Sequence, residues 1–211
     1  FIEIMQNTDG IFHFAALAKV QESIEDPILY ENHNTVGTLH MLKCANDSNI
    51  KRFVYSASSA AYGNKEKMPC KETDKIDPIS PYALQKYYGE IQARMFAKIY
   101  NIETVSLRYF NAYGERQNVN GAYATVMGVF AYQMMNNQPM TIRGDGEQRR
   151  DFTYVGDIVR ANYLAMHSHK VGSGEVINIG SGISFSVNEI AKMLGGEVVY
   201  VDPVIEPKES L

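Results

Sequence analysis

Short apolar segments alternate with longer amphipathic ones along the chain. Residues 10–16 (GIFHFAA) and 51–58 (KRFVYSAS) are brief, apolar and rich in β-branched or aromatic side chains, as buried strands are. Between them, residues 34–48 place Val36 and Leu39 near helical spacing. The same pattern predicts, further along, a polar loop over 63–80, helices over 81–100, 122–136, 155–168 and 186–194, and strands over 103–110, 139–143, 175–179 and 197–201.

This alternation predicts an α/β fold in which helices cover both faces of a parallel sheet. The opening residues, FIEIMQNTD, resemble the end of a helix that leads into a buried strand. A doubly wound domain usually begins with a strand and a glycine-rich phosphate turn, but the sequence contains no G-x-G-x-x-G. The last residues, EPKESL, close no predicted element. We therefore interpret the chain as the middle of a longer protein.

Composition narrows the classes of function. The chain is 45% hydrophobic and 21% charged, which is ordinary for a globular protein, and its net charge of −4 offers no basic stripe for nucleic acid. No apolar run approaches the roughly 20 residues that span a bilayer, and no signal peptide opens the chain. Cys44 and Cys70 lack metal or redox spacing, and the five histidines form no metal motif. We expect a cytoplasmic protein with reduced thiols and no metal.

The segment SPYALQK contains a candidate proton-transfer pair. Ser80 can cap a helix that begins at Pro81, which places Tyr82 in the first turn and Lys86 one turn later on the same face. A nearby ammonium and a helix N-terminus both favour the phenolate and so lower the pKa of a tyrosine. The spacing alone does not decide, because ordinary amphipathic helices also carry such Tyr–Lys pairs.

A serine-rich turn, SASSAAYG at 56–63, directly follows a predicted strand. Ligands of α/β proteins bind at this C-terminal end of the strands. Ser58 could there hydrogen-bond the same substrate hydroxyl that Tyr82 deprotonates. The alternative is a turn whose serines satisfy their own backbone.

Six motifs in order resemble the extended short-chain dehydrogenase/reductases, in the branch of NAD-dependent nucleotide-sugar epimerases and dehydratases. Within that branch the chain is most similar to UDP-glucose and UDP-N-acetylglucosamine 4-epimerases. The resemblance covers nearly the whole chain and implies a Rossmann-like doubly wound parallel sheet, N-terminally incomplete, with a smaller C-terminal α/β domain. The motifs are HFAALAKVQES, ENHNTVGT, SASSAAYG, PYALQK, LRYFNAYGERQ and GDGEQRRDFTYVGDI.

The resemblance also implies roles for individual residues. Tyr82 would be the base, Lys86 would bind the nicotinamide ribose and lower the pKa of Tyr82, and Ser58 would be the third catalytic group. Arg150 would clamp the diphosphate, although an ion pair with Asp151 or Asp157 is the alternative. The other residues implied near NAD are Phe14, Ala15, Ala16, Asn34, Ser56, Tyr109 and Phe110, and those implied near the sugar nucleotide are Ser59, Asn111, Ala122, Ala124, Thr125 and Ser210.

Two positions favour epimerisation over elimination of water. The 4,6-dehydratases of this family carry an Asp–Glu pair where this chain has Ser59 and Ala60. The expected activity is therefore 4-epimerisation of a UDP-hexose or UDP-N-acetylhexosamine through a 4-keto sugar. A UDP-glucuronate decarboxylase or another dehydratase remains an alternative, as does a non-catalytic fragment that binds sugar nucleotides.

The resemblance finally implies an organisation and an assembly. Residues 1–111 would form the NAD-binding domain without its first strands and glycine-rich loop. Residues 112–211 would mainly bind the nucleotide sugar, with some elements packing back on the sheet. A homodimer is expected through the helices near 35–48 and 81–100.

Overall fold

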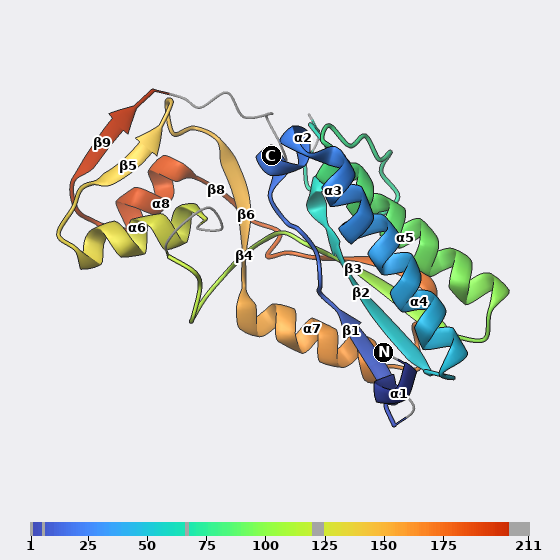
Figure 1. Ribbon diagram of the computed structural model, residues 1–211. Helices are drawn as coiled ribbons and strands as arrows, with labels where there is room; N and C mark the ends of the chain where they lie inside the picture. Colours follow the sequence, from blue (N-terminus) through green and yellow to red (C-terminus); the bar gives the residue numbers. More distant parts are fainter. Residues whose placement is uncertain (1, 6, 66–67, 120–124, 203–211) are drawn as a thin grey trace.

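The computed structural model describes residues 2–5, 7–65, 68–119 and 125–202. Its main sheet has four strands, which run parallel in the order β1-β2-β3-β7 (Figure 1). The sequence prediction of a parallel α/β sheet is therefore confirmed. The strands are β1 (Gly10–His13), β2 (Arg52–Ser58), β3 (Glu103–Tyr109) and β7 (Ser173–Ile179).

Alternation of side chains along β2 divides the core into two layers. Phe53 and Tyr55 point to one face, where they pack in a cluster with residues of α4 (Gly37–Asp47) and α5 (Pro81–Ile99). Val54 points to the other face and packs near Ala165 of α7 (Val155–His167). Figure 1 shows α4 and α5 along one face of the sheet and α7 along the other. Helices thus cover both faces, as the alternation of elements predicts.

The start of α5 follows from its capping residues. Ser80 Oγ accepts a hydrogen bond from the N–H of Ala83 at 3.1 Å, and Pro81 occupies the first helical position. The helix therefore begins where the sequence predicts. This fixes Tyr82 in the first turn, close to the C-terminal ends of the strands.

A second region is built from short strands and two helices around one apolar cluster. Its three-stranded sheet is β4 (Asn111–Tyr113), β6 (Arg149–Tyr154) and β8 (Ser184–Ser186), and β5 (Met140–Arg143) pairs with β9 (Val198–Val201). The helices are α6 (Val126–Met135) and α8 (Val187–Leu194). We call the buried side chains between these elements the apolar cluster: Phe130, Met140, Ile142, Phe152, Val187, Ile190 and Ala191.

Several predicted boundaries are wrong, and each error has a local cause. The strand predicted over 10–16 ends at His13, because residues 14–19 leave the sheet to reach two short helices that lack a long apolar period. The helix predicted over 34–48 is preceded by a π-helical turn at Asn32–Val36. β6 was not predicted because its sequence, RRDFTY, begins with three charges. The remaining helices are α1 (Ile2–Met5), α2 (Val20–Glu25), α3 (Pro27–Glu31) and a 3₁₀ turn at Ser59–Tyr62.

Candidate functional site

The parallel register brings three strand ends together at one edge of the main sheet. Ser58, the last residue of β2, lies opposite Tyr109, the last residue of β3. The ring of Phe14, just beyond β1, stacks on that of Tyr109 with centroids 6.1 Å apart and an angle of 8° between the planes. The edge therefore gathers Phe14, Ser58 and Tyr109 from three separate parts of the sequence.

Lys86 lies inside the protein, beneath this edge. Its side chain is on α5, only 3% of the residue is exposed, and Nζ lies 4.8 Å from the centre of the Tyr55 ring. Tyr55 in turn donates a hydrogen bond from its hydroxyl to the carbonyl of Lys86 at 3.3 Å. A Cβ atom at Gly89 would lie 2.2 Å from this hydroxyl, so glycine at that position allows the helix to approach the sheet.

Tyr82 is half-buried and lies one turn before Lys86. Its backbone N–H donates to Ser23 Oγ at 3.2 Å, and Ser23 on α2 is fully buried. The phenol lies close enough to Tyr55 to act on the pKa of that residue electrostatically. Tyr82 and Lys86 thus share Tyr55 as a common neighbour, and Ser23 fixes the first turn of the helix.

Burial dominates the electrostatics of the interface between α5 and the main sheet, which we call the seam. It lowers the pKa of Lys86 to about 8, although the charge of Glu90 acts in the opposite direction. Burial, with a smaller contribution from Lys86, lowers the pKa of His13 to about 4. The Tyr109 pKa rises to about 12, again through burial, while its hydrogen bond to Asn162 opposes the shift. Of Lys86, His13 and Tyr109, Lys86 therefore has the pKa nearest to neutral.

Ser58 has a structural role and keeps a chemical capability. Its Oγ caps the 3₁₀ turn by accepting from the N–H of Ala60 at 3.2 Å. The hydroxyl hydrogen is not used in that bond, because an accepting oxygen still carries its own O–H donor. The local alternative for the serine-rich turn is thus partly correct, and it leaves Ser58 able to bond a ligand. Ser59 is buried and Ser56 half-buried.

Asn34 fixes the loop that follows β1. Its Oδ1 accepts from the N–H of Leu17 at 2.8 Å, and its Nδ2 donates to the Leu17 carbonyl at 2.9 Å and to Gln85 Oε1 at 3.2 Å. Only 1% of Asn34 is exposed. The amide therefore connects the loop to the π-helical turn before α4 and to α5. Asn34 thus acts on the predicted cofactor residues Ala15 and Ala16 by fixing the backbone of their loop.

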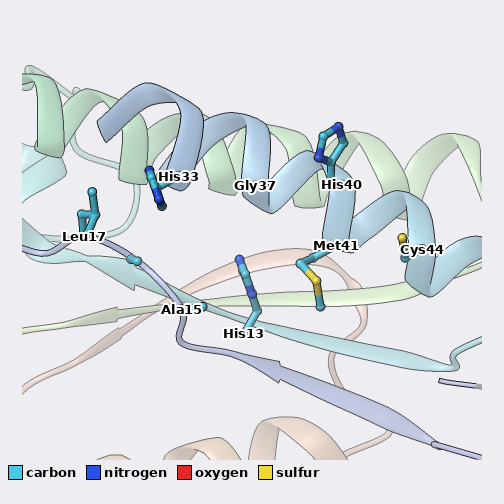
Figure 2. Close-up of a pocket in the computed structure, with 9 residues that line it drawn as sticks. His13, Ala15, Leu17, His33, Gly37, His40, Met41 and Cys44 are labelled. Carbon is cyan, nitrogen blue, oxygen red and sulfur yellow. The ribbon is translucent and has the colours of Figure 1, made fainter. Parts of the chain in front are cut away.

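A cavity of about 500 Å³ opens between that loop and the start of α4 (Figure 2). Ala15 and Ala16 line it, whereas Tyr82 and Lys86 lie outside its wall. Figure 2 shows Leu17 and Ala15 on the loop side, facing side chains from the helix. Sequence reasoning did not identify the helix side of this cavity, although its helical spacing of i, i+4, i+7, i+8 and i+11 was a usable signal. The residues on that side are His33, Gly37, His40, Met41 and Cys44.

The predicted substrate residues lie where the main sheet meets the second region. Asn111 donates from Nδ2 to the carbonyl of Asp151 at 2.9 Å, which joins β4 to β6. Arg150 is half-exposed, and its Nη1 donates to the carbonyl of Arg149 at 2.8 Å. Thr125 is exposed and its hydroxyl is hydrogen-bonded by Gln117. Ala122, Ala124 and Ser210 lie outside the described residues.

A second cavity, of about 300 Å³, adjoins these residues. Phe110 and Asp151 line it together with Asn178, which the sequence analysis did not select. Asn178 Oδ1 accepts from the hydroxyl of Tyr62 at 2.7 Å, and its Nδ2 donates to the carbonyl of Cys70 at 3.0 Å. The cavity has a wall held in place by hydrogen bonds, next to the predicted sugar-binding Asn111.

Two features are absent from the described part of the chain. No group of three or more His, Cys, Asp or Glu side chains is arranged there to hold a metal ion. None of the described helices has the length and apolar character needed to cross a bilayer.

Most of the chain is similar in sequence to known proteins. Residues 1–180 match the model of the NAD dependent epimerase/dehydratase family. The chain is 31% identical to the UDP-glucose 4-epimerase of Mycolicibacterium smegmatis over 89% of its own length, and it spans 59% of that protein.

Solved structures agree with this result. A UDP-N-acetylglucosamine 4-epimerase from Methanobrevibacter ruminantium, in complex with UDP-N-acetylmuramic acid, superposes with a TM-score of 0.90 at 37% identity. That match covers 97% of this chain and 67% of the other. A UDP-glucuronic acid 4-epimerase from Bacillus cereus, in complex with UDP-glucuronic acid and NAD, gives a TM-score of 0.87 at 32% identity, over 98% of this chain and 67% of the other. The Rossmann-type fold inferred from the sequence motifs is confirmed.

Proposed function

The chain belongs to the NAD dependent epimerase/dehydratase family, and on that premise we propose that the protein inverts the configuration at C4 of a UDP-hexose or UDP-N-acetylhexosamine through a 4-keto intermediate. The observation that carries the proposal is the position of Tyr82, Lys86 and Ser58 around the C-terminal edge of β2. Ser59 and Ala60, which replace the acid pair of the dehydratases, favour epimerisation.

The residues present fit the nicotinamide–ribose end of NAD. Lys86 offers a buried ammonium, the stacked rings of Phe14 and Tyr109 offer a flat apolar wall, and Ala15 and Ala16 leave room for close approach to the backbone. NAD, when bound, supplies a hydride acceptor that takes hydride from C4 of the sugar and returns it. The sequence contains no glycine-rich turn for the pyrophosphate, so the proposal assigns these residues to the nicotinamide end alone.

Tyr82 moves the proton in this proposal. Its phenolate takes the proton of the sugar 4-hydroxyl while hydride leaves C4, and the phenol returns the proton when hydride comes back to the other face. The Lys86 ammonium stabilises the phenolate and so lowers the pKa of Tyr82 toward the working pH. Ser58 donates its free O–H to the 4-oxygen and orients it between the two transfers.

We assign recognition of the sugar nucleotide to the region around the second cavity. Phe110 and Asp151 line it, Asn111 donates a hydrogen bond to the carbonyl of Asp151, and Arg150 presents a guanidinium whose forked shape suits a diphosphate. Residues 1–111, with α7 and β7 packed on their sheet, form the cofactor-binding part of the proposal. The remainder of the chain forms the substrate-binding part.

The proposal includes a homodimer through α4 and α5. Leu84, Tyr88, Ile91 and Met95 are all more than a third exposed, and their spacing of four, three and four residues forms one stripe along α5. Such a stripe on an unpartnered helix face is typical of an interface. Light scattering should report a dimer that Ile91→Glu converts to a monomer, while Val159→Glu on the exposed face of α7 leaves the dimer intact.

The test is an assay of the protein at its full encoded length. Proton NMR follows its incubation with UDP-glucose, UDP-N-acetylglucosamine and UDP-glucuronic acid, each with NAD. We expect one of the first two to give a mixture of its C4 epimers. Release of CO₂ from UDP-glucuronic acid would instead identify a decarboxylase. Binding of UDP-sugars without conversion of any of the three would contradict the enzymatic proposal.

A further inference from the structure

A fully buried ion pair joins α5, the helix of Tyr82 and Lys86, to β3. Arg108 of β3 donates from Nε to Glu90 Oε1 at 2.8 Å and from Nη2 to Oε2 at 2.7 Å. The side chains of Glu90 and Arg108 are 0% and 2% exposed. Among the described residues, the third guanidinium nitrogen, Nη1, has no hydrogen-bond partner. The pair therefore makes two short hydrogen bonds but leaves one buried donor without a hydrogen-bond acceptor.

Stability alone is a poor explanation for such a pair. Removing two charges from water costs about as much as their attraction returns, so hydrophobic residues in their place often serve as well. Arg52 and Glu103, at the opposite end of β2 and β3, form a pair in which Glu103 is 58% exposed. That pair keeps contact with solvent, whereas Glu90 and Arg108 are buried next to the candidate site.

Glu90 is one helical turn from Lys86 and on the same face of α5. The other titratable or charged groups near this pair come from several elements: His13 of β1, Tyr55 of β2, Tyr62 of the 3₁₀ turn, Arg108 of β3, and Tyr82 and Arg94 of α5. None of these groups is a carboxylate, so Glu90 brings the negative charge. Its charge also acts on Lys86 against the effect of burial.

We propose that Glu90, held by Arg108, is a positioning residue that keeps the buried Lys86 in its ammonium form. Burial raises the pKa of Glu90, whereas the bidentate contact with Arg108 acts in the opposite direction and so favours the ionised carboxylate. The carboxylate compensates the ammonium one turn away. The consequence for Tyr82 rests on the function proposed above: a protonated Lys86 stabilises the phenolate, and a neutral one does not.

The titration of Lys86 can be measured without any catalysis. In protein labelled with ¹³C at lysine Cε, one resonance should titrate near pH 8, and Lys86→Met should remove it. Glu90→Gln should lower that midpoint by about one pH unit, because the ammonium loses its compensating charge. Glu90→Asp, which keeps the charge, should retain the midpoint largely. Glu103→Gln, the matched loss of an Arg-paired carboxylate, should leave it unchanged.

A midpoint that Glu90→Gln leaves unchanged would overturn the proposal. Should Glu90→Gln not fold because Arg108 is left buried without a partner, the double variant Glu90→Gln with Arg108→Met is compared with Arg108→Met alone, from which it differs only by the carboxylate. Equal Lys86 midpoints in these two proteins would likewise overturn the proposal. In active protein, the alkaline limb of the kcat/KM profile should move to lower pH in Glu90→Gln but not in Glu103→Gln. Absence of epimerase activity would defeat the proposed function and leave the lysine titration as an independent result.

Discussion

The two parts of the molecule differ in the chemistry of their buried side chains. The seam between α5 and the main sheet buries Tyr55, Lys86, Glu90 and Arg108, with His13 nearby on β1, so polar and charged side chains lie there beside apolar ones such as Phe53 and Phe96. The apolar cluster of the second region contains only hydrocarbon, aromatic and thioether side chains. Both are closely packed, yet only the seam adjoins the strand ends where the candidate site lies.

The seam carries a cost that the apolar cluster does not. Lowering the pKa of Lys86 from 10.5 to about 8 means that the unfolded chain binds this proton more tightly. This difference lowers the free energy of unfolding by on the order of 3 kcal/mol below about pH 8, and the effect disappears as the pH rises toward 10.5. The apolar cluster therefore contributes stability that the buried charges of the seam reduce, and five substitutions test this division.

The largest expected effect is on chemistry. Tyr82→Phe removes the proposed base but keeps the ring, and we expect kcat to fall by about two to four orders of magnitude. The midpoint of denaturant unfolding should change little, because the backbone N–H that bonds Ser23 remains. Full activity in Tyr82→Phe would contradict the assignment of Tyr82 as the base.

The next effect is on stability. Phe130 is fully buried in the apolar cluster, and Phe130→Ala should lower the free energy of unfolding by about 3–5 kcal/mol through the lost burial and the resulting cavity. Urea unfolding followed by circular dichroism measures it. The ¹³C titration of Lys86 should keep its midpoint under conditions where the variant is folded. A shifted midpoint would show that the two regions are coupled.

The sequence predicts the two regions unequally well. Strong signals gave the main sheet and α5, since a cap, a proline and a long amphipathic period mark the helix from Ser80 onward. The short strands β4, β6 and β8 carry no comparable period, and β6 is recognisable only through its partners Asn111–Tyr113 and Ser184–Ser186. Their positions depend on tertiary pairing, which one sequence does not display.

The candidate site divides in the same way. Tyr82, Lys86 and Ser58 stand out because their residue types imply chemistry at a strand end or a helix start. Ser23 and Glu90 act through neighbours that are 59 and 18 residues away in sequence, respectively, and neither has a local motif. Sequence reasoning therefore found the groups proposed to touch ligands and missed the groups that hold them.

A third, smaller effect concerns the pH dependence of the seam. The pKa of His13 falls from 6.5 to about 4 in the folded state, so the folded protein keeps this histidine neutral. Above pH 6.5 this histidine is neutral in both states and does not change the free energy of unfolding. As the pH falls toward 4, the unfolded chain binds a proton that the folded protein does not, which lowers the free energy of unfolding by on the order of 3 kcal/mol. His13→Gln should therefore unfold with a shallower dependence on pH between 6.5 and 4. Parallel curves for the two proteins would contradict the buried neutral state.

The smallest effect compares two serines with the same chemistry, one in each region. Ser80 Oγ accepts from the N–H of Ala83 at 3.1 Å, and Ser186 Oγ accepts from the N–H of Glu189 at 3.1 Å. Replacing either serine by alanine should cost about 1 kcal/mol of unfolding free energy, the usual value of a lost N-cap. Chemical denaturation measures both losses under one condition.

Their effects on activity should nevertheless differ. Ser80 caps the turn that contains Tyr82, so Ser80→Ala loosens the proposed base and should reduce kcat. Ser186 caps α8, which does not carry the proposed base, so Ser186→Ala should leave kcat unchanged. Equal losses of stability with unequal losses of kcat would place the division between the regions at the level of a single hydrogen bond. Equal losses of kcat would instead mean that activity follows overall stability, because the two caps are matched in donor, acceptor and distance.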